Sequence, residues 1–326
     1  MAKMTMVQAL NLALRQEMER DENVIVLGED VGVDGGVFRV TDGLHEAFGE
    51  ERVVDTPLAE NGIVGMSIGM AVYGLRPVCE IQFSGFAYQN FHQIENHASR
   101  LRWRSQGRYH VPMVLRAPYG GGVRALEHHS ESREAFWAHI PGLKMVIPSG
   151  PRSARALLVS AIRDPDPVIF YEAKALYRAF REEVPEEEET LPLGESRIAR
   201  EGDDLTLISY GAMLRPTLSA AEQLEKEDGV SAEVIDLLTI SPLDDTLFVT
   251  SVKKTGHAMI VHEAPMSFGP GAEIIARLVE KAFYYLEVPI GRVTGYDVVI
   301  PLFAREKDYI PSVERITHEA RRILET

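Results

Sequence analysis

Cysteine is almost absent from this chain, and so are the short signatures of nucleotide binding. One cysteine in 326 residues excludes a disulfide framework and any cysteine-based zinc or iron–sulfur site. No G-x-x-x-x-G-K-[ST] occurs, and no G-x-G-x-x-G opens a helix after an apolar strand, so P-loop and dinucleotide chemistry are unsupported. Basic residues are in deficit, with 34 Lys and Arg against 49 Asp and Glu. The net charge of −15 argues against binding to a phosphate backbone, and we expect no nucleic-acid partner.

Long apolar runs are missing too. The longest weakly polar stretch, residues 61–75, is rich in glycine and is shorter than the ~20 residues that a membrane span needs. Residues 1–22 carry charges after Leu14 and are followed by no small-residue cleavage site, so they do not read as a signal peptide. We therefore expect a cytoplasmic chain that does not associate with membranes.

Apolar runs of strand length alternate with amphipathic helical patterns along the chain. The runs are near-continuous, as is typical of parallel strands that are covered on both faces. They form a first series at 24–30, 52–57, 76–83, 111–118, 143–149 and 166–172, and a second at 204–211, 231–237, 257–263 and 291–297. Helical patterns separate them, at 215–227 and 270–286 for example. This alternation predicts an α/β protein with two doubly wound domains.

A block of like charge separates the two series of strands. Residues 181–190 read REEVPEEEET, and their six glutamates repel one another. This composition predicts a solvated connector that does not pack. We therefore predict one domain at residues 1–181, an acidic linker at 182–203 and a second domain at 204–326.

Two features at predicted strand ends of the first domain have the residue types of a ligand site. Open parallel sheets bind ligands at the carboxyl ends of their strands. Glu60 follows such a strand and opens a glycine-rich apolar helix, where the helix dipole favours its ionised form and burial disfavours it. A carboxylate in this balance suits proton exchange with a bound heteroaromatic ring, although a plain helix-start glutamate explains the spacing more simply. Phe86 and Tyr88 follow another predicted strand. Aromatic residues at this place either stack on a flat ligand or belong to the core.

Paired histidines occupy a predicted loop later in the same domain. His128 and His129, within EHHSES, have the chemistry of acid–base groups, of metal ligands or of exposed loop residues. Metal binding is the weaker alternative because no H-E-x-x-H spacing occurs, and no G-x-S-x-G elbow surrounds Ser130. The single cysteine, Cys79, lies within an apolar strand and reads as inert core.

Taken together, these segments resemble the beta subunit of the thiamine-diphosphate-dependent 2-oxo acid dehydrogenases, the decarboxylating first components of the pyruvate and branched-chain complexes. The resemblance covers nearly the whole chain and rests on ordered matches that include LGEDVG, GGVFRVTDGL, RVVDTPLAENGIVG, HHSES, HIPGLKMVIPS and LISYGAMLRP. It implies an N-terminal transketolase-like domain that binds the cofactor's aminopyrimidine ring, followed by a C-terminal transketolase-type domain.

The resemblance also implies roles for individual residues. Glu60, within DTPLAEN, matches the glutamate that hydrogen-bonds N1′ of the aminopyrimidine and so favours the N4′-imino form that removes the thiazolium C2 proton. Phe86 matches an aromatic residue that stacks on the pyrimidine, and we expect Gln89 and His128 to support cofactor binding. His129 matches a catalytic histidine that steers protons or the incoming lipoyl group.

The resemblance concerns two cations, potassium and Mg²⁺. Some relatives bind potassium, at positions that match Met113, Ala161, Ile162, Asp164 and Asp166, although the turn AIRDPDP serves equally well without an ion. The family holds the cofactor's diphosphate through Mg²⁺ with a G-D-G motif, which this chain lacks. We therefore expect a separate alpha subunit to hold Mg²⁺ in an α2β2 heterotetramer, with a lipoyl acyltransferase core as a further partner.

The activity implied is oxidative decarboxylation of a 2-oxo acid with reductive acylation of a lipoyl group, and only together with the alpha subunit. The stretch HHSESREAFWAHIPG favours branched-chain substrates of the 2-oxoisovalerate type, which we expect, whereas Phe86 and GRYH favour pyruvate. Acetoin dehydrogenases share much of the pattern. Transketolase and deoxyxylulose-phosphate synthase are disfavoured because they carry the G-D-G half within the same chain. A non-catalytic α/β binding protein is the remaining alternative.

Overall fold

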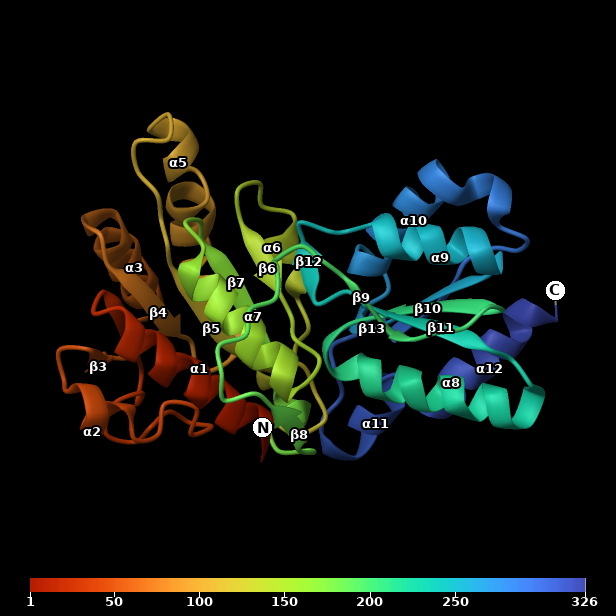
Figure 1. Cartoon of the computed structure of the whole chain (residues 1–326), viewed down its shortest axis with the longest axis horizontal. Helices are drawn as coiled ribbons and strands as arrows, with labels where there is room; N and C mark the ends of the chain where they lie inside the picture. Colours follow the sequence, from red (N-terminus) through yellow and green to blue (C-terminus); the bar gives the residue numbers. More distant parts are fainter. Residues whose placement is uncertain (326) are drawn as a thin grey trace. The chain divides into compact units, whose positions relative to one another are not determined.

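The computed structural model describes residues 1–325 and divides into two compact units, each built on a sheet flanked by helices (Figure 1). Unit 1 comprises residues 1–119 and 136–193, and unit 2 comprises residues 120–135 and those from 194 onward. The α/β class predicted from the alternation of strands and helices is confirmed. The assignment of residues 120–135 to unit 2 was not predicted, because nothing in their composition distinguishes them from the neighbouring loops.

The sheet of unit 1 is parallel throughout. Its strands lie in the order β6-β7-β5-β4-β2-β3. They are β2 (Val24–Gly28), β3 (Val53–Asp55), β4 (Arg76–Glu80), β5 (Val114–Tyr119), β6 (Lys144–Val146) and β7 (Val168–Ala173). Because β2 lies between β3 and β4, successive strands are added on opposite sides of it. The carboxyl ends of these three strands therefore form a topological switch point, where sheets of this kind bind ligands.

Three longer helices flank this sheet. α1 (Met6–Arg20) packs against α7 (Pro151–Arg163), and α3 (Glu60–Tyr73) packs against β4. α1 begins with a capping box in which Thr5 and Gln8 satisfy each other's main-chain N–H groups, a feature worth about 1 kcal/mol. The shorter helices are α2 (Leu44–Phe48), α4 (Phe91–Gln93), α5 (Leu101–Arg104) and α6 (Glu134–Ala138).

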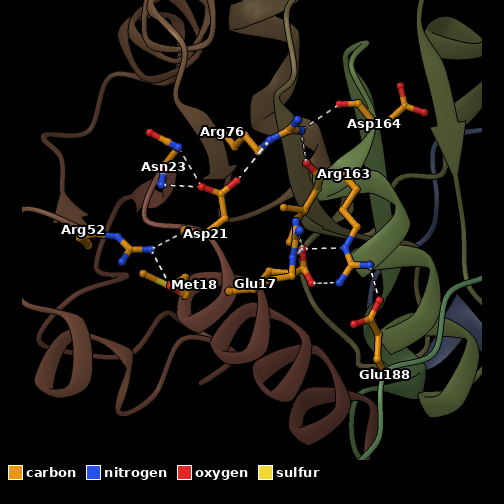
Figure 2. Close-up of polar contacts among 11 residues, drawn as sticks. Glu17, Met18, Asp21, Asn23, Arg52, Arg76, Arg163, Asp164 and Glu188 are labelled. Carbon is orange, nitrogen blue, oxygen red and sulfur yellow. Dashed lines mark hydrogen bonds and ion pairs between the residues drawn. The ribbon is translucent and has the colours of Figure 1, made fainter.

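The acidic segment that follows β7 is exposed at Glu186, Glu187 and Glu188, but it makes contacts that the prediction of a connector that does not pack did not include. β8 (Glu182–Val184) pairs antiparallel with β1 (Ala2–Met4) at the start of the chain. Further along, Glu188 lies 2.5 Å from Arg163 of α7, and Arg163 also forms an ion pair of 2.6 Å with Glu17 of α1 (Figure 2). The arginine of α7 thus offsets part of the repulsion among the glutamates, a term that a local reading of charge does not contain.

Two further arginines tie the end of α1 to the sheet of unit 1. Arg52 donates to the main-chain carbonyl oxygens of Met18, Asp21 and Val24 at 2.8 to 3.1 Å. Arg76, at the start of β4, lies 3.6 Å from the carboxylate of Asp21 (Figure 2). These contacts close the connection between the end of α1 and the start of β2.

Unit 2 has a five-stranded sheet in the order β14-β13-β10-β11-β9. β10 (Leu205–Ser209), β11 (Ala232–Asp236), β13 (Ala258–Pro265) and β14 (Gly291–Gly295) are parallel, and β9 (Arg197–Arg200) is an antiparallel edge strand. In Figure 1, α8 (Leu214–Asp228) and α12 (Val313–Leu324) cover one face, whereas α9 (Thr246–Thr255) and α10 (Pro270–Ala282) cover the other. Unit 2 also contains β12 (Thr239–Ser241) and α11 (Glu306–Tyr309).

The predicted 182–203 linker is therefore structured at both of its ends. β8 lies at its start in unit 1, and β9 lies near its end in unit 2, with the change between units at residues 193 and 194. Within residues 1–325, no helix combines the length and the apolar composition that crossing a membrane requires.

Candidate active site

Glu60 is the first residue of α3 and lies at the switch point of unit 1. Its side chain is only 3 % exposed. Its Oε2 atom is buried and has no hydrogen-bond partner among residues 1–325. Since the large majority of buried side-chain polar atoms in folded proteins are paired, an orphaned carboxylate oxygen at this position indicates a group that the protein chain itself does not provide.

A second buried carboxylate, Glu29, follows β2 at the same edge of the sheet. Burial raises the pKa of the Glu29 carboxyl, and the negative charges of Glu60 and Asp30 raise it further. Glu29 Oε1 is likewise buried and unpaired within the described part of the chain. The sequence shows Glu29 directly after an apolar strand, but its importance depends on β2 lying beside β3, which the local pattern does not reveal.

Two neutral polar side chains extend this set of orphaned atoms. Thr56 follows β3 and Asn90 follows β4, and the Thr56 hydroxyl and both amide atoms of Asn90 are buried without partners in the described chain. The connections that follow β2, β3 and β4 thus carry unpaired acceptors and unpaired donors. An aminopyrimidine ring carries ring nitrogens and an exocyclic amine, so its hydrogen-bonding groups fit such a set. We conclude that these residues fit the cofactor that the sequence resemblance implies.

The aromatic residues after β4 lie in a 3-10 segment, Ser84–Asn90. Phe86 is half-buried and meets Phe83 edge to face with ring centroids 5.9 Å apart. Tyr88 has a similar contact with Phe136 at 6.1 Å. Gln89 is exposed. Phe86 therefore belongs to an aromatic cluster at the edge of the sheet that bears Glu60, and its half-burial leaves ring surface for a stacking partner.

A buried ionic network lies in the strands beside this edge. Arg116 of β5 donates to Glu80 of β4 at 2.7 Å and to both carboxylate oxygens of Glu172 of β7, at 2.7 and 2.9 Å. Tyr177 donates its hydroxyl to Glu172 at 2.6 Å. Burial alone would lower the pKa of Arg116, but Glu172 and Glu80 raise it well above its ordinary value. The guanidinium therefore stays charged and fixes three neighbouring strands to one another.

His128 and His129 lie in unit 2, on the loop of residues 120–135, whereas Glu60, Phe86 and Gln89 belong to unit 1. Both histidines fall in a 3-10 turn, Glu127–His129, and both are half-buried. His128 Nδ1 lies 4.0 Å from the Glu131 carboxylate. The described residues contain no cluster of three His, Cys, Asp or Glu side chains suited to a metal, so nothing supports the alternative that these histidines are metal ligands.

The residues expected at a potassium site surround the turn after α7. The Asp164 carboxylate accepts from Lys144 at 2.7 Å, and that of Asp166 accepts from Arg102 at 2.6 Å. Arg76 donates to the Ile162 carbonyl oxygen at 2.8 Å. Cationic side chains thus neutralise both carboxylates. A potassium ion here would be held by main-chain oxygens, including those of Met113 and Ala161, each of which has two lone pairs.

Cys79, the remaining residue with nucleophilic chemistry, is completely buried in β4. Burial raises the pKa of its thiol to about 12, so the thiolate form is negligible at neutral pH. The interpretation of Cys79 as an inert core residue agrees with this environment.

Comparison with known protein families gives one domain match in each half of the chain. The transketolase pyrimidine-binding domain matches residues 2–179, and the transketolase C-terminal domain matches residues 194–316. The chain is similar to the pyruvate dehydrogenase E1 component subunit beta of Staphylococcus epidermidis, with 52 % identity over 325 residues, and to that of Bacillus subtilis, with 51 %. Each of these matches spans 100 % of both chains.

A solved structure supports the fold. A split-gene transketolase, determined as an inactive beta4 tetramer, has a TM-score of 0.82 over 99 % of each chain at 21 % identity. A likeness at this identity concerns the fold alone, whereas the full-length matches at about half identity concern the family. The chain therefore belongs to the beta subunits of the thiamine-diphosphate-dependent 2-oxo acid dehydrogenases.

Proposed function

We propose that this chain, together with an alpha subunit, carries out the decarboxylation of a 2-oxo acid and the reductive acylation of a lipoyl group. The observation that carries the proposal is the buried Glu60 carboxylate, with an unpaired oxygen, at the switch point of unit 1. When bound, thiamine diphosphate supplies the electron sink for loss of CO₂. Glu60 would hold a proton at N1′ of the aminopyrimidine, which requires a carboxylate oxygen without a partner in the described chain, such as Oε2.

The residues around Glu60 would serve this proton chemistry. Glu29 has a raised pKa, so its carboxyl is protonated more often than an exposed glutamate, which limits the negative charge that faces Glu60. Thr56 and Asn90 would hydrogen-bond polar edges of the ring, and Phe86 would stack on its face. Gln89 and His128 would have supporting roles in cofactor binding. His129 would steer protons or the incoming lipoyl group.

The partners that we propose supply the parts of the cofactor site that this chain lacks. The chain has no G-D-G motif, and residues 1–325 contain no carboxylate or histidine cluster suited to a metal. Both facts support an alpha subunit that holds Mg²⁺ and the diphosphate in an α2β2 heterotetramer. A lipoyl acyltransferase core would be the acceptor of the acyl group. Potassium at the turn of residues 161–166 remains a prediction from the resemblance.

Two observations favour different 2-oxo acids as the substrate. Relatives named pyruvate dehydrogenase, at 49 to 52 % identity, favour pyruvate. The stretch of residues 128–142 favours branched-chain 2-oxo acids, the substrates expected from the sequence. We take pyruvate as the first substrate to test, because the relatives match over the full length, and branched-chain 2-oxo acids as the second.

The test is reconstitution with the alpha subunit. We expect CO₂ release from pyruvate or from 2-oxoisovalerate only when both subunits and thiamine diphosphate are present, and the ratio of kcat/KM values identifies the substrate. An acetoin dehydrogenase would cleave acetoin instead. Turnover of 2-oxo acids by this chain alone, or no thiamine dependence in the assembled enzyme, would contradict the proposal.

A further inference from the structure

The sheet of unit 2 has a switch point of its own, where side chains form hydrogen bonds with another segment of the same unit. β10 lies between β11 and β13, so the carboxyl ends of β10 and β13 are where a doubly wound sheet binds a ligand. Tyr210 follows β10, and Glu263 lies near the end of β13. Both side chains contact the loop of residues 120–135, which bears His128 and His129.

Glu263 is 4 % exposed and joins the two ends of this loop. Its Oε1 atom accepts a short hydrogen bond from the main-chain N–H of Gly121, at the start of the loop. The same atom accepts from the Ser132 hydroxyl at 3.2 Å, near the end of the loop. Gly120 donates its N–H to the Glu131 carbonyl oxygen at 3.1 Å, which also joins the two ends of the loop.

Glu306, at the start of α11, holds the next part of the loop. Its Oε1 accepts from the N–H of Gly122 at 3.0 Å, and its Oε2 accepts from the N–H of Arg124 at 3.1 Å. Gly120 and Gly122 have φ values of +79° and +90°, which residues with a side chain rarely adopt. These two glycines turn successive N–H groups toward the two carboxylates.

Glu134 anchors the far end of the loop. It is fully buried, and its Oε1 accepts from the Tyr210 hydroxyl at 2.6 Å. Three buried carboxylates therefore hold one short segment. Because burying a carboxylate is costly unless its bonds are made, the loop and the carboxylates of Glu263 and Glu306 stabilise each other. Glu134 Oε2, in contrast, is buried without a partner in the described chain.

We propose that Glu263 and Glu306 are positioning residues that fasten the loop of residues 120–135 and so fix where His129 is presented to substrate. The position of His129 rests on the proposed function, whereas the fastening of the loop does not. Neither glutamate is assigned a step in proton transfer. Each acts through main-chain N–H groups eight to five residues before His129 in the sequence.

The fastening is tested by trypsin cleavage of the assembled enzyme, with thiamine diphosphate bound. Arg124 and Arg133 lie on either side of the histidines, so cleavage after them reports opening of the loop. We expect Glu263→Ala and Glu306→Ala to speed cleavage there by roughly tenfold or more. Glu263→Gln keeps an acceptor oxygen and should largely restore protection. Glu280→Ala, at an exposed glutamate of α10, is the matched control and should match the unchanged chain.

Cleavage rates equal to the control in both alanine variants would overturn the proposal. So would faster cleavage spread evenly over sites outside the loop, since that reports general destabilisation. If Glu263→Gln behaves like Glu263→Ala, the charge rather than the hydrogen-bond geometry is responsible, which also contradicts a positioning role.

The effect on His129 is tested by a double-mutant cycle. We expect Glu263→Ala to slow the same step as His129→Ala, and the double variant to be no slower than His129→Ala alone. Rate losses that multiply would show that Glu263 does not act through His129. If His129→Ala leaves both decarboxylation and lipoyl acylation unchanged, the role proposed for His129 fails, while the trypsin experiment still decides whether the loop is fastened.

Discussion

Glu134 makes the stability of unit 2 depend on pH, and Glu134→Gln isolates the effect. Burial raises the pKa of this carboxyl from 4.5 to about 7, the Tyr210 hydroxyl opposes the rise, and the charge of Glu263 adds to it. At ~1.4 kcal/mol for each pKa unit, this difference amounts to about 3 kcal/mol. The folded chain therefore retains a proton that the unfolded chain has released between these two pH values.

The sign follows from that extra proton. Stability is highest below the unfolded pKa and falls as pH rises toward the folded value, above which the loss is complete. The glutamine side chain of the variant does not titrate, and its amide oxygen still accepts from Tyr210. We expect Glu134→Gln to gain about 2 to 3 kcal/mol relative to the unchanged chain between pH 5 and pH 8.

The measurement is urea unfolding at fixed protein concentration at both pH values, because association also shifts the midpoint. Glu280→Gln, at an exposed position on α10, is the control and should show no pH-dependent difference. A difference between Glu134→Gln and the unchanged chain that stays constant from pH 5 to pH 8 would refute the reasoning.

Three further predictions concern unit 1. Glu60→Gln should leave the circular dichroism spectrum unchanged and lower CO₂ release in the assembled enzyme by ~10²-fold or more, and near-normal turnover would contradict its role. Arg116→Met leaves two buried carboxylates without their partner and should cost about 3 to 5 kcal/mol in urea unfolding, whereas a cost near zero would show that water or protons replace the guanidinium. Asp166→Asn should leave any difference in Tm between KCl and NaCl unchanged, because its carboxylate is paired with Arg102, and loss of that difference would make Asp166 an ion ligand.

Much of the fold is legible in the sequence because buried parallel strands are apolar along their whole length. The runs at 24–30 and 257–263, for example, contain β2 and most of β13. Strands β1, β8, β9 and β12 were not predicted, and their sequences, AKM, EEV, RIAR and TIS, contain no apolar run of strand length. β8 exists because it pairs with β1, far away in the sequence, and the exposed acidic segment that follows it contacts α7 through the ion pair of Glu188 with Arg163. Neither partner is visible in a local window.

Some residues of the candidate site could be predicted from the sequence, and others could not. Their places after predicted strands made Glu60 and Phe86 candidates, but a plain helix start and a core aromatic explained the spacing more simply. The family resemblance was what favoured a site. Glu29 could not be weighed, since its raised pKa comes from burial and from Glu60 on a neighbouring connection. The fastening of the histidine loop was equally hidden, because Glu263 lies 142 residues from Gly121 and Glu306 lies 184 residues from Gly122.

The two sheets use the same topological feature differently. In unit 1, Glu29, Glu60, Thr56 and Asn90 leave buried polar atoms unpaired at the switch point, so the site costs folding energy that a ligand can return. In unit 2, Glu263 and Glu306 bind the loop of residues 120–135, and Tyr210 donates to Glu134 of that loop. Within the described chain, the second Glu134 oxygen and the Ser130 hydroxyl of this loop are left buried without a hydrogen-bond partner. It follows that cofactor binding should stabilise unit 1 far more than unit 2. Hydrogen exchange in the assembled enzyme would show this as slower exchange around β2, β3 and the start of α3, with the core strands of unit 2 unchanged. Equal protection of both units would mean that the cofactor acts through assembly rather than through the orphaned groups.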